Sequence, residues 1–408
     1  MLRTVTIFPA ILVFLAPVAP AQILALKEPP KSRASATSTA RAPSDDAARA
    51  LALSFEDAVR RGARDECMAL FDHAAILERA SKGIPATEKV KKLFHEGARE
   101  SWNADSGLVG YAIATVASGG SLRWLHFGDR GGEHTAVFRL TRADASAPEY
   151  IELILAPRGE RGAVAIDVLS STDAASCSRV LRRWLLALVA DAGRTLPERI
   201  AGEDRSFALA GRTFETIDHA FEAGRNADAL AAWATLPENV RLDPSVVLSR
   251  LRAALAAGPT TFDAVLGEVH AAHVGDPSVE LLAIDVAIAT NRPTQALDAL
   301  DVLARVAPED PYREALRGSI LRDLGRREEA RAACRRAVQA DPRLEDAYWT
   351  LLGLAIEGQR HEEALTLLTR MDEQFEIDWR GLGDAPAYAA FLESKEGSRW
   401  RAKFASSR

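Results

Sequence analysis

The sequence is poor in cysteine, methionine and aromatic residues: among 408 residues there are three Cys, three Met and 6% aromatics. Three cysteines are too few for a disulfide scaffold, and Cys67, Cys177 and Cys334 lack metal-ligand spacing. An exported compartment would permit a Cys67–Cys177 bridge. The alternative, which we favour, is that each is a small buried side chain, because spacing alone does not place two thiols within bonding distance.

The sequence also lacks a basic block and the common catalytic motifs. Its net charge is −6, and phosphate binding needs clustered Lys and Arg, so nucleic acid is excluded as a partner. There is no phosphate-binding glycine loop, no HExxH and no G-x-S-x-G. We therefore predict a chain that is not an enzyme and has no cofactor and no metal.

No apolar run is long and unbroken enough to span a membrane. The first residues instead predict a cleaved signal peptide over 1–21, with Arg3 as the positive region, an apolar stretch over 4–18, and small residues at Ala19 and Ala21. We expect an exported chain, periplasmic or secreted, that is soluble after cleavage. The alternative is an N-terminal membrane anchor, which the three prolines in and after the run argue against.

Residues 22–46 are rich in Ala, Ser, Pro and Thr and predict a disordered linker. From residue 47 apolar residues recur at helical spacing, and beyond residue 120 the period falls to two. Four strands with Gly-rich turns between them are predicted at 121–128, 134–141, 149–156 and 163–170. Helices followed by an antiparallel meander indicate an α+β domain over 47–172.

This order of elements, with stretches such as FEDAVRRGARDECMALFD and EYIELILAP, resembles the nuclear transport factor two-like fold. The resemblance implies a curled four-stranded sheet, and a pocket or a homodimer surface. That fold carries both enzymes and binding modules, so it does not decide the function. Residues 173–204 are predicted to be a connecting helix and linker.

A repeat along the second half of the sequence is the strongest pattern in the chain. The segment 325–331 recurs at 359–365, and 291–297 is an earlier copy at the same spacing. Gly and Asn at the start of these copies suit turns with positive φ, and small residues at Ala296, Ala330 and Ala364 suit close helix packing. The pattern resembles the tetratricopeptide repeat. We predict an all-α solenoid of helical hairpins over 205–376 and a C-terminal cap over 377–408.

The resemblance implies a groove for a protein or peptide partner, lined by the first helix of each hairpin. The groove-facing positions that we predict for the partner are Asp285, Tyr312, Arg322, Asp323, Trp349 and Glu357. Exposed Tyr and Trp are common binding anchors. An alternative of equal weight is that Tyr312 and Trp349 pack between neighbouring repeats.

One weaker constellation lies in the predicted strands. His126, Glu152 and Asp167 could face a shared pocket beside Trp124, in which a raised carboxyl pKa would make a base. The alternative is that these polar residues lie on the solvated face of the sheet. Asp72-His73 is predicted to be a helix surface pair. The sequence thus favours an exported interaction scaffold; the alternative is a small-molecule-binding or hydrolase/isomerase-like pocket in the α+β domain.

Overall fold

The computed structural model describes residues 42–103, 107–142, 148–171, 175–192, 200, 202–273, 276–306, 310–375, 377 and 379–406. The predicted signal peptide and most of the predicted linker lie outside these residues. Contacts divide the chain into two compact units, unit 1 (Met1–Val279) and unit 2 (Glu280–Arg408). Within the described residues, no helix is both long and apolar enough to cross a membrane.

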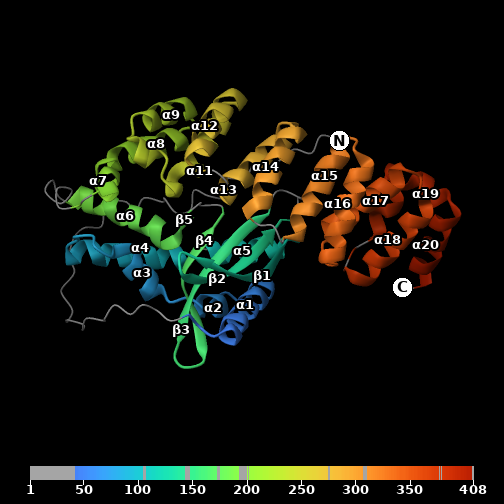
Figure 1. Ribbon diagram of the computed structural model, residues 1–408, viewed down its shortest axis with the longest axis horizontal. Coiled ribbons are helices and arrows are strands. Elements are labelled where there is room, and N and C mark those ends of the chain that lie inside the picture. Colours follow the sequence, from blue (N-terminus) through green and yellow to red (C-terminus); the bar gives the residue numbers. More distant parts are fainter. Residues whose placement is uncertain are drawn as a thin grey trace. The chain divides into compact units, whose positions relative to one another are not determined.

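Unit 1 begins with helices that precede the sheet, as the sequence predicts (Figure 1). They are α1 (Asp45–Arg60), α2 (Arg64–Ala69), α3 (His73–Ser81), α4 (Glu88–Asn103) and α5 (Leu108–Ala117). The Ser44 side chain caps α1 by accepting a hydrogen bond from the backbone nitrogen of Ala47 at 3.3 Å. Leu51, Phe55 and Val59 recur every four residues along α1 and are all buried, so one side of the helix faces the core.

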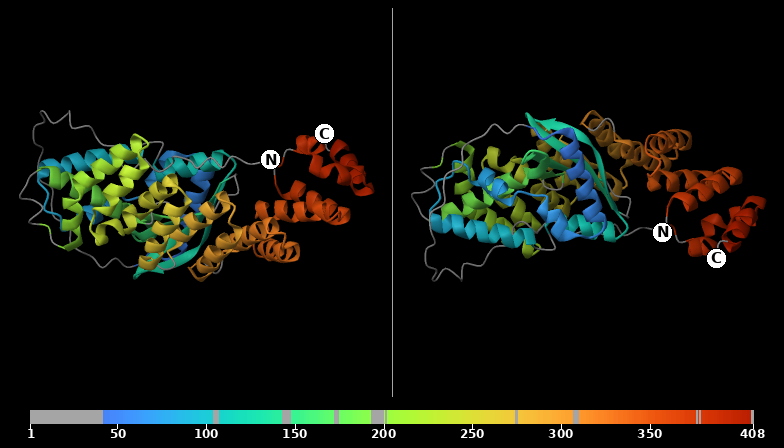
Figure 2. Two further views of the ribbon diagram at one scale, coloured as in Figure 1. Left: turned by 90° about the horizontal axis from the view of Figure 1, so that it is seen from above. Right: turned by 90° about the horizontal axis from the view of Figure 1, so that it is seen from below.

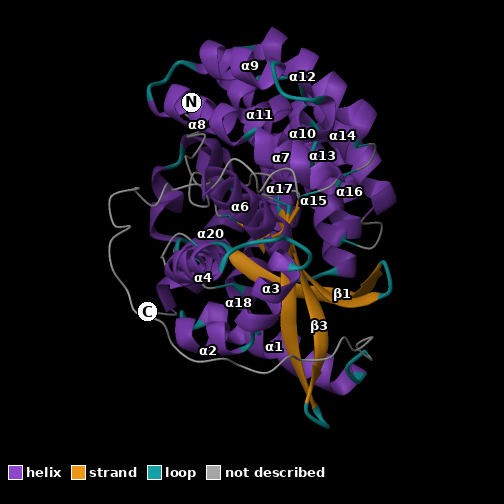
Figure 3. Cartoon of the chain, turned by 90° about the vertical axis from the view of Figure 1, so that its left-hand side faces the viewer, coloured by secondary structure: helices purple, strands orange, loops and turns teal. Residues whose placement is uncertain are grey.

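The described sheet has five antiparallel strands in the order β1-β2-β3-β4-β5. They are β1 (Ser121–Arg130), β2 (Glu133–Thr141), β3 (Glu149–Arg158), β4 (Gly162–Ser170) and β5 (Ala175–Ser176). The predicted meander is confirmed. The predicted number of four strands is wrong, because the described sheet has a fifth strand, β5, of two residues. Register shifts at Trp124/His126 and Ile154/Leu155 interrupt the pairing. Such bulges bend and twist strands, and Figure 3 shows the strands twisted rather than flat.

The two faces of the sheet differ, because side chains alternate along each strand. One face carries Phe138, Ile151 and Leu153, which are buried in a cluster with residues of α1, α2 and α5. The rings of Phe55 and Phe138 meet edge to face in this cluster, with centroids 5.3 Å apart. Glu152 lies between Ile151 and Leu153 in sequence and therefore belongs to the opposite face.

A second core in unit 1 joins α3 and α4 to helices that follow the sheet, from α6 to α10. The helices after the sheet are α6 (Cys177–Ala192), α7 (Gly202–Leu209), α8 (Gly211–Glu222), α9 (Asn226–Ala234), α10 (Glu238–Arg241), α11 (Pro244–Ala257) and α12 (Pro259–Ala272). Leu185, Val189 and Trp233 are buried in this second core. A Cβ at Gly97 would come within 2.3 Å of the Trp184 ring, so α4 packs closely on α6 only because residue 97 is glycine.

A network of ion pairs also joins α6, α7 and α11. Nη2 of Arg179 and Nη2 of Arg183 each lie 2.6 Å from Oδ2 of Asp243, which is 3% exposed. Arg183 Nη1 lies 2.9 Å from Oδ1 of Asp204. Asp243 also caps α11, because its Oδ1 accepts a hydrogen bond from the backbone nitrogen of Ser245 at 2.9 Å. Through Arg183, this one carboxylate connects three helices.

Unit 2 consists of successive helices of similar length, which Figure 2 shows side by side in chain order. They are α13 (Pro277–Ala289), which contains the break between units, then α14 (Pro293–Val306), α15 (Pro311–Asp323), α16 (Arg327–Ala340), α17 (Glu345–Glu357) and α18 (His361–Gln374). The first helices of the hairpins start at Pro277, Pro311 and Glu345, which are equally spaced along the chain. The predicted helical hairpins are confirmed here, and the break after Val279 falls inside the predicted repeat range 205–376.

The turns inside the hairpins have the predicted backbone conformation. Asn291 has φ 55°, Gly325 has φ 73° and the earlier Gly224 has φ 69°. Gln359 takes the same conformation at φ 51° without being Gly or Asn. A left-handed residue at this point ends the first helix and lets the second begin.

Close packing inside a hairpin follows from small residues. Ala296, Ala330 and Ala364 are all fully buried, at 0% exposure. A Cβ at Gly318 of α15 would lie 2.2 Å from Sγ of Cys334 on α16, so these two helices touch where residue 318 has no side chain. The small residues that recur at equal spacing in the sequence therefore lie where the two helices of a hairpin pack together.

The segment predicted as a cap packs on the last hairpin. It contains η3 (Trp379–Asp384), η4 (Pro386–Tyr388), α19 (Ala389–Glu393) and α20 (Lys395–Ser406). Trp379, Phe391 and Trp400 are buried in one cluster with Leu368 and Met371 of α18. This segment covers apolar residues of α18.

Candidate functional site

Asp167, one of the four predicted pocket residues, has a structural role. Its carboxylate is 0% exposed and sits at the N-terminus of α6. Oδ1 accepts a hydrogen bond from the backbone nitrogen of Ser178 at 3.0 Å, and Oδ2 accepts one from the Ser178 hydroxyl. Nε of Arg79 on α3 lies 3.3 Å from Oδ2. Asp167 thus fastens α3 and α6 to the sheet.

The other three predicted pocket residues do not join Asp167 in a cavity. His126 is exposed, and its Nδ1 lies 2.9 Å from the carbonyl oxygen of its neighbour Phe127. Glu152 pairs with Arg130, whose Nη2 lies 2.6 Å from Oε1. Trp124 lies on the other face of the sheet from Glu152, the face that carries Phe138. There the guanidinium of Arg49 on α1 lies 5.0 Å from the Trp124 ring centroid.

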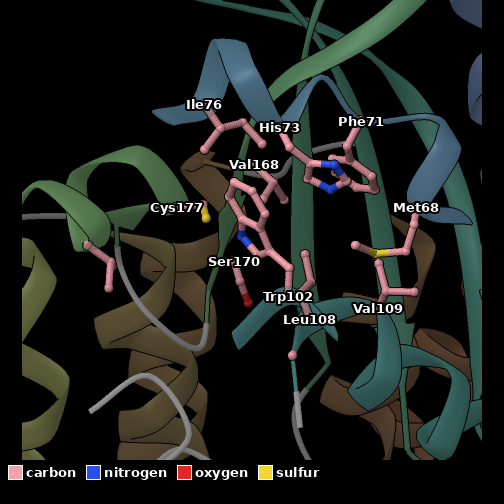
Figure 4. A pocket seen from close by; sticks show the side chains of 12 residues that line it. Met68, Phe71, His73, Ile76, Trp102, Leu108, Val109, Val168, Ser170 and Cys177 are labelled. Carbon is pink, nitrogen blue, oxygen red and sulfur yellow. The ribbon is translucent and has the colours of Figure 1, made fainter. Parts of the chain in front are cut away.

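The structure has a cavity elsewhere in unit 1, between β4 and the surrounding helices (Figure 4). Its volume is about 60 Å³. The side chains around it are mostly apolar and come from α2 to α6 and β4; they are Met68, Phe71, His73, Ile76, Trp102, Leu108, Val109, Val168, Ser170, Cys177 and Val180. In the view of Figure 4 the indole of Trp102 lies between Cys177 and Ser170 on one side and His73 and Phe71 on the other.

Among the residues around this cavity, His73 is the titratable side chain that contacts aromatic rings. Its ring centroid lies 4.5 Å from that of Trp102 and 6.3 Å from that of Phe71. Burial lowers the pKa of His73 below its usual value, and the charge of Asp72 only partly opposes this. The imidazole is therefore neutral at pH 7. The Asp72 side chain itself caps α3, accepting a hydrogen bond from the backbone nitrogen of Ala75 at 3.0 Å.

This cavity was not predicted from the sequence. The prediction of Asp72-His73 as a surface pair is wrong for His73, which is half-buried. The available signal was the number of large side chains at the ends of helices, such as Phe71, Trp102 and Leu108. These residues are far apart in the chain, so their meeting depends on how α3, α4 and α5 cover the sheet.

The three thiols are free in the structure, and no Cys67–Cys177 bridge is formed. Burial raises the pKa of Cys67 to about 11 and that of Cys334 to about 12. At neutral pH both are therefore protonated and unreactive. Within the residues that the structure describes, no group of three or more His, Cys, Asp or Glu side chains is placed to hold a metal ion.

In unit 2 the two aromatic residues predicted for the groove are packed. Tyr312 is 2% exposed. Trp349 is half-buried against the cap, with its ring centroid 5.6 Å from that of Trp379, and its Nε1 donates a hydrogen bond to Glu345 at 2.8 Å. Tyr312 is thus buried, as in the alternative of packing between neighbouring repeats, whereas Trp349 stays half-buried and contacts the cap rather than another repeat.

The four charged groove positions lie on the first helices α13, α15 and α17. Arg322 of α15 reaches α17, where its Nη2 lies 2.6 Å from Oε1 of Glu357. Asp323 is exposed next to this pair. Desolvation by neighbouring groups raises the pKa of Asp323, the charge of Arg322 opposes this, and the carboxylate of Glu357 adds a smaller increase. Asp285 is half-buried on α13.

No protein-family model matches the chain. No curated protein matches it. Two solved chains that resemble it in structure are titled "MamA MSR-1 C2" and "MamA AMB-1 P212121". Their identities are 21% and 22%, they cover 39% and 43% of this chain and 92% and 95% of their own, and the TM-scores are 0.31 and 0.32. A TM-score this low carries no argument about this chain.

Proposed function

We propose that the chain is a non-catalytic scaffold that binds a protein partner on the first-helix face of unit 2. The observation that carries this proposal is the equal spacing of the starts of α13, α15 and α17, each of which is followed by a second helix. Stacked hairpins of this kind expose one continuous face of first helices, which suits an extended or helical peptide. Contact between the first helices is seen in the Arg322–Glu357 pair.

The charge of this face favours a partner segment that carries Lys or Arg. Its carboxylates outnumber its guanidinium groups: Asp285, Asp323, Asp346 and Glu357 lie on the three helices together with Arg322. We include neither Tyr312, which is buried, nor Trp349, which is half-buried against Trp379 of the cap, in this face.

Two further parts of the proposal rest on the sequence alone. Export is supported by Arg3 and the apolar stretch over 4–18, and it is checked by N-terminal sequencing of the mature protein. A homodimer through the α+β domain is supported by the resemblance to the nuclear transport factor two-like fold, and sedimentation of the full chain checks it.

The experiment that tests partner binding reverses one exposed charge. Protein partners are first captured with the full chain. We expect Asp323→Lys to weaken their binding roughly fivefold, because a favourable charge contact becomes a repulsive one. The control is Asp298→Lys, the same change at an exposed position on the second helix α14. Affinities are measured with the full chain at two salt concentrations, and the effect should shrink at high salt. Equal affinities for both variants would contradict this choice of face.

A further inference from the structure

Ile288 is an exposed apolar side chain on the first-helix face of unit 2. Among the described residues, the large apolar side chains that are exposed are Leu53, Leu209 and Ile288, and of these Ile288 alone belongs to unit 2. It lies on α13 three residues after Asp285 and therefore on the same side of that helix. A single exposed apolar residue is ordinary on a protein surface. Its meaning depends on what covers the same position in the other repeats.

The repeat gives Ile288 two equivalent positions. Ile288, Arg322 and Ile356 are equally spaced along the chain, and each is the next-to-last residue of a first helix, α13, α15 or α17. The same spacing separates the starts of these three helices. Because the repeats of one array stack alike, a contact in one pair of repeats predicts the corresponding contact in the next pair.

At Ile356 this position is covered by the chain's own cap. The cap element η4 packs on α17, and its Tyr388 packs with Ile356 against the apolar cluster of the last hairpin. Burial raises the pKa of Tyr388 and the charge of Arg322 opposes this, so the guanidinium on α15 lies close to the phenol. Ile356 is half-buried, whereas Ile288 is 39% exposed. The Tyr388 ring thus lies against the first-helix face where α15 meets α17.

The same arrangement, moved back by one repeat, gives a site formed by α13 and α15. Arg322 then takes the position of Ile356, and Ile288 takes the position of Arg322. Both side chains favour an aromatic ring, Ile288 through burial of apolar surface and Arg322 through a cation–π contact. The same step moves Glu357, the ion-pair partner of Arg322, to Asp323, which is exposed. A carboxylate beside the ring favours a positive charge on the same ligand.

We propose that Ile288 and Arg322 bind an aromatic side chain of the partner, and that a Lys or Arg of the same segment lies beside Asp323. The site uses the face proposed above for the partner and therefore depends on that function. It adds the residue type that anchors the partner, and aromatic side chains are frequent anchors of this kind. Tyr388 makes the equivalent contact within the chain itself.

Short peptides separate the effect of the ring from that of the charge. The first probe, with acetyl and amide ends, is APAYAK in one-letter code, which repeats cap residues 385–389 and adds a lysine. APAAAK lacks the ring, and APAYAA lacks the charge. Each is titrated into the full chain carrying ¹³C-labelled isoleucine methyl groups.

The methyl signals of Ile288 and Ile356 report on the two equivalent positions. APAYAK should shift the Ile288 signal to saturation and leave Ile356 unchanged, because Tyr388 already covers Ile356. APAAAK should bind roughly fivefold more weakly, because it lacks the ring. In Tyr388→Ala the second position is uncovered, and APAYAK should then shift Ile356 as well.

Ile288→Ser tests the anchor itself. The acetyl methyl signal of each peptide broadens on binding and gives the affinity in every variant. The preference for APAYAK over APAAAK should be lost in Ile288→Ser, while the preference for APAYAK over APAYAA remains. The matched control is Leu209→Ser, the same kind of change at an exposed apolar residue of unit 1.

Three results would overturn the proposal. The first is equal affinity of the unchanged chain for APAYAK and APAAAK, a comparison that needs no variant. The second is a preference for tyrosine that survives in Ile288→Ser or is lost equally in Leu209→Ser. The third is an Ile356 signal that APAYAK does not move in Tyr388→Ala.

Failure of this site and failure of the proposed function give different results. A preference for lysine without a preference for tyrosine removes the aromatic anchor and leaves the charged face in place. Partner affinities that are equal in Asp323→Lys and Asp298→Lys remove the face itself.

Discussion

The two units differ in how far apart along the chain their contacts lie. In unit 1, Nη1 of Arg182 donates to the carbonyl oxygen of Ala80, 102 residues earlier, and Arg79 reaches Asp167 across 88 residues. In unit 2, the Arg322–Glu357 pair spans 35 residues, which is close to one repeat. Each repeat contacts mainly its neighbours in the chain. In unit 1, by contrast, ion pairs and hydrogen bonds of arginine side chains join segments that are far apart in the chain.

The largest effect that would sharpen this comparison is expected at Asp243 in unit 1. Asp243→Asn leaves Arg179 and Arg183 without their shared carboxylate, and we expect a loss of about 3 kcal/mol in the free energy of unfolding. Denaturant unfolding is followed through the methyl signals of Met68 for unit 1 and Met371 for unit 2. The Met68 signal should be lost at lower denaturant, with a smaller change for Met371.

The same carboxylate predicts a pH dependence for unit 1. Burial would raise the pKa of Asp243, but the hydrogen bond from Arg179 and the charge of Arg183 outweigh it and lower the pKa below 3.8. A carboxyl group with a lowered pKa contributes stability above its unfolded pKa and loses it as the pH falls through the folded value. Stability should therefore fall less steeply below about pH 4 in Asp243→Asn. Exposed Asp298→Asn is the control, and an identical acid profile in all three chains would disprove the network's role.

A second, smaller effect tests whether the repeat register is set by packing. Gly318→Ala places a methyl group 2.2 Å from Sγ of Cys334 and 3.1 Å from the carbonyl oxygen of Ala330. We expect a loss of about 1–3 kcal/mol, measured through Met371. Cys334→Ala should relieve part of this loss in the double variant, giving a coupling energy of about 1 kcal/mol.

The control for Gly318→Ala is Gly353→Ala on α17, the first helix of the next hairpin. There the added methyl group meets the guanidinium of Arg322, which can move away, and alanine favours a helix over glycine by about 1 kcal/mol. Gly353→Ala should therefore leave unit 2 as stable or more stable. Equal losses for the two glycines, or additive losses for Gly318→Ala and Cys334→Ala, would show that the contact between α15 and α16 does not set the register.

The repeat helices could be predicted from the sequence because their information is local. Turn residues such as Asn291 and Gly325, and buried alanines such as Ala330, recur at equal spacing along the chain. The strand order was also predictable, since neighbouring strands follow each other in the chain. The two-residue β5 was not, because it is too short to show a period of two.

The sites could be predicted only in part. Alternation along β4 put Asp167 among polar candidates, but its role depends on Ser178 and Arg79, which approach it only through the docking of α6 and α3. The cavity at His73 depends on the same docking. At Trp349 the pattern indicated the correct helix, but the cap residue Trp379 that covers it lies outside the repeat.

The smallest effect is expected for the ion pair of unit 2, and it gives the sharpest contrast with Asp243. The side chains of Arg322 and Glu357 are 37% and 34% exposed, so water screens their charges, and a double-mutant cycle with Arg322→Ala and Glu357→Ala should give at most about 1 kcal/mol of coupling. Added salt should reduce it further. A coupling as large as the loss in Asp243→Asn, or one that resists salt, would mean that unit 2 is held by charges as unit 1 is. A small coupling leaves this pair available to a partner, as the proposed function requires.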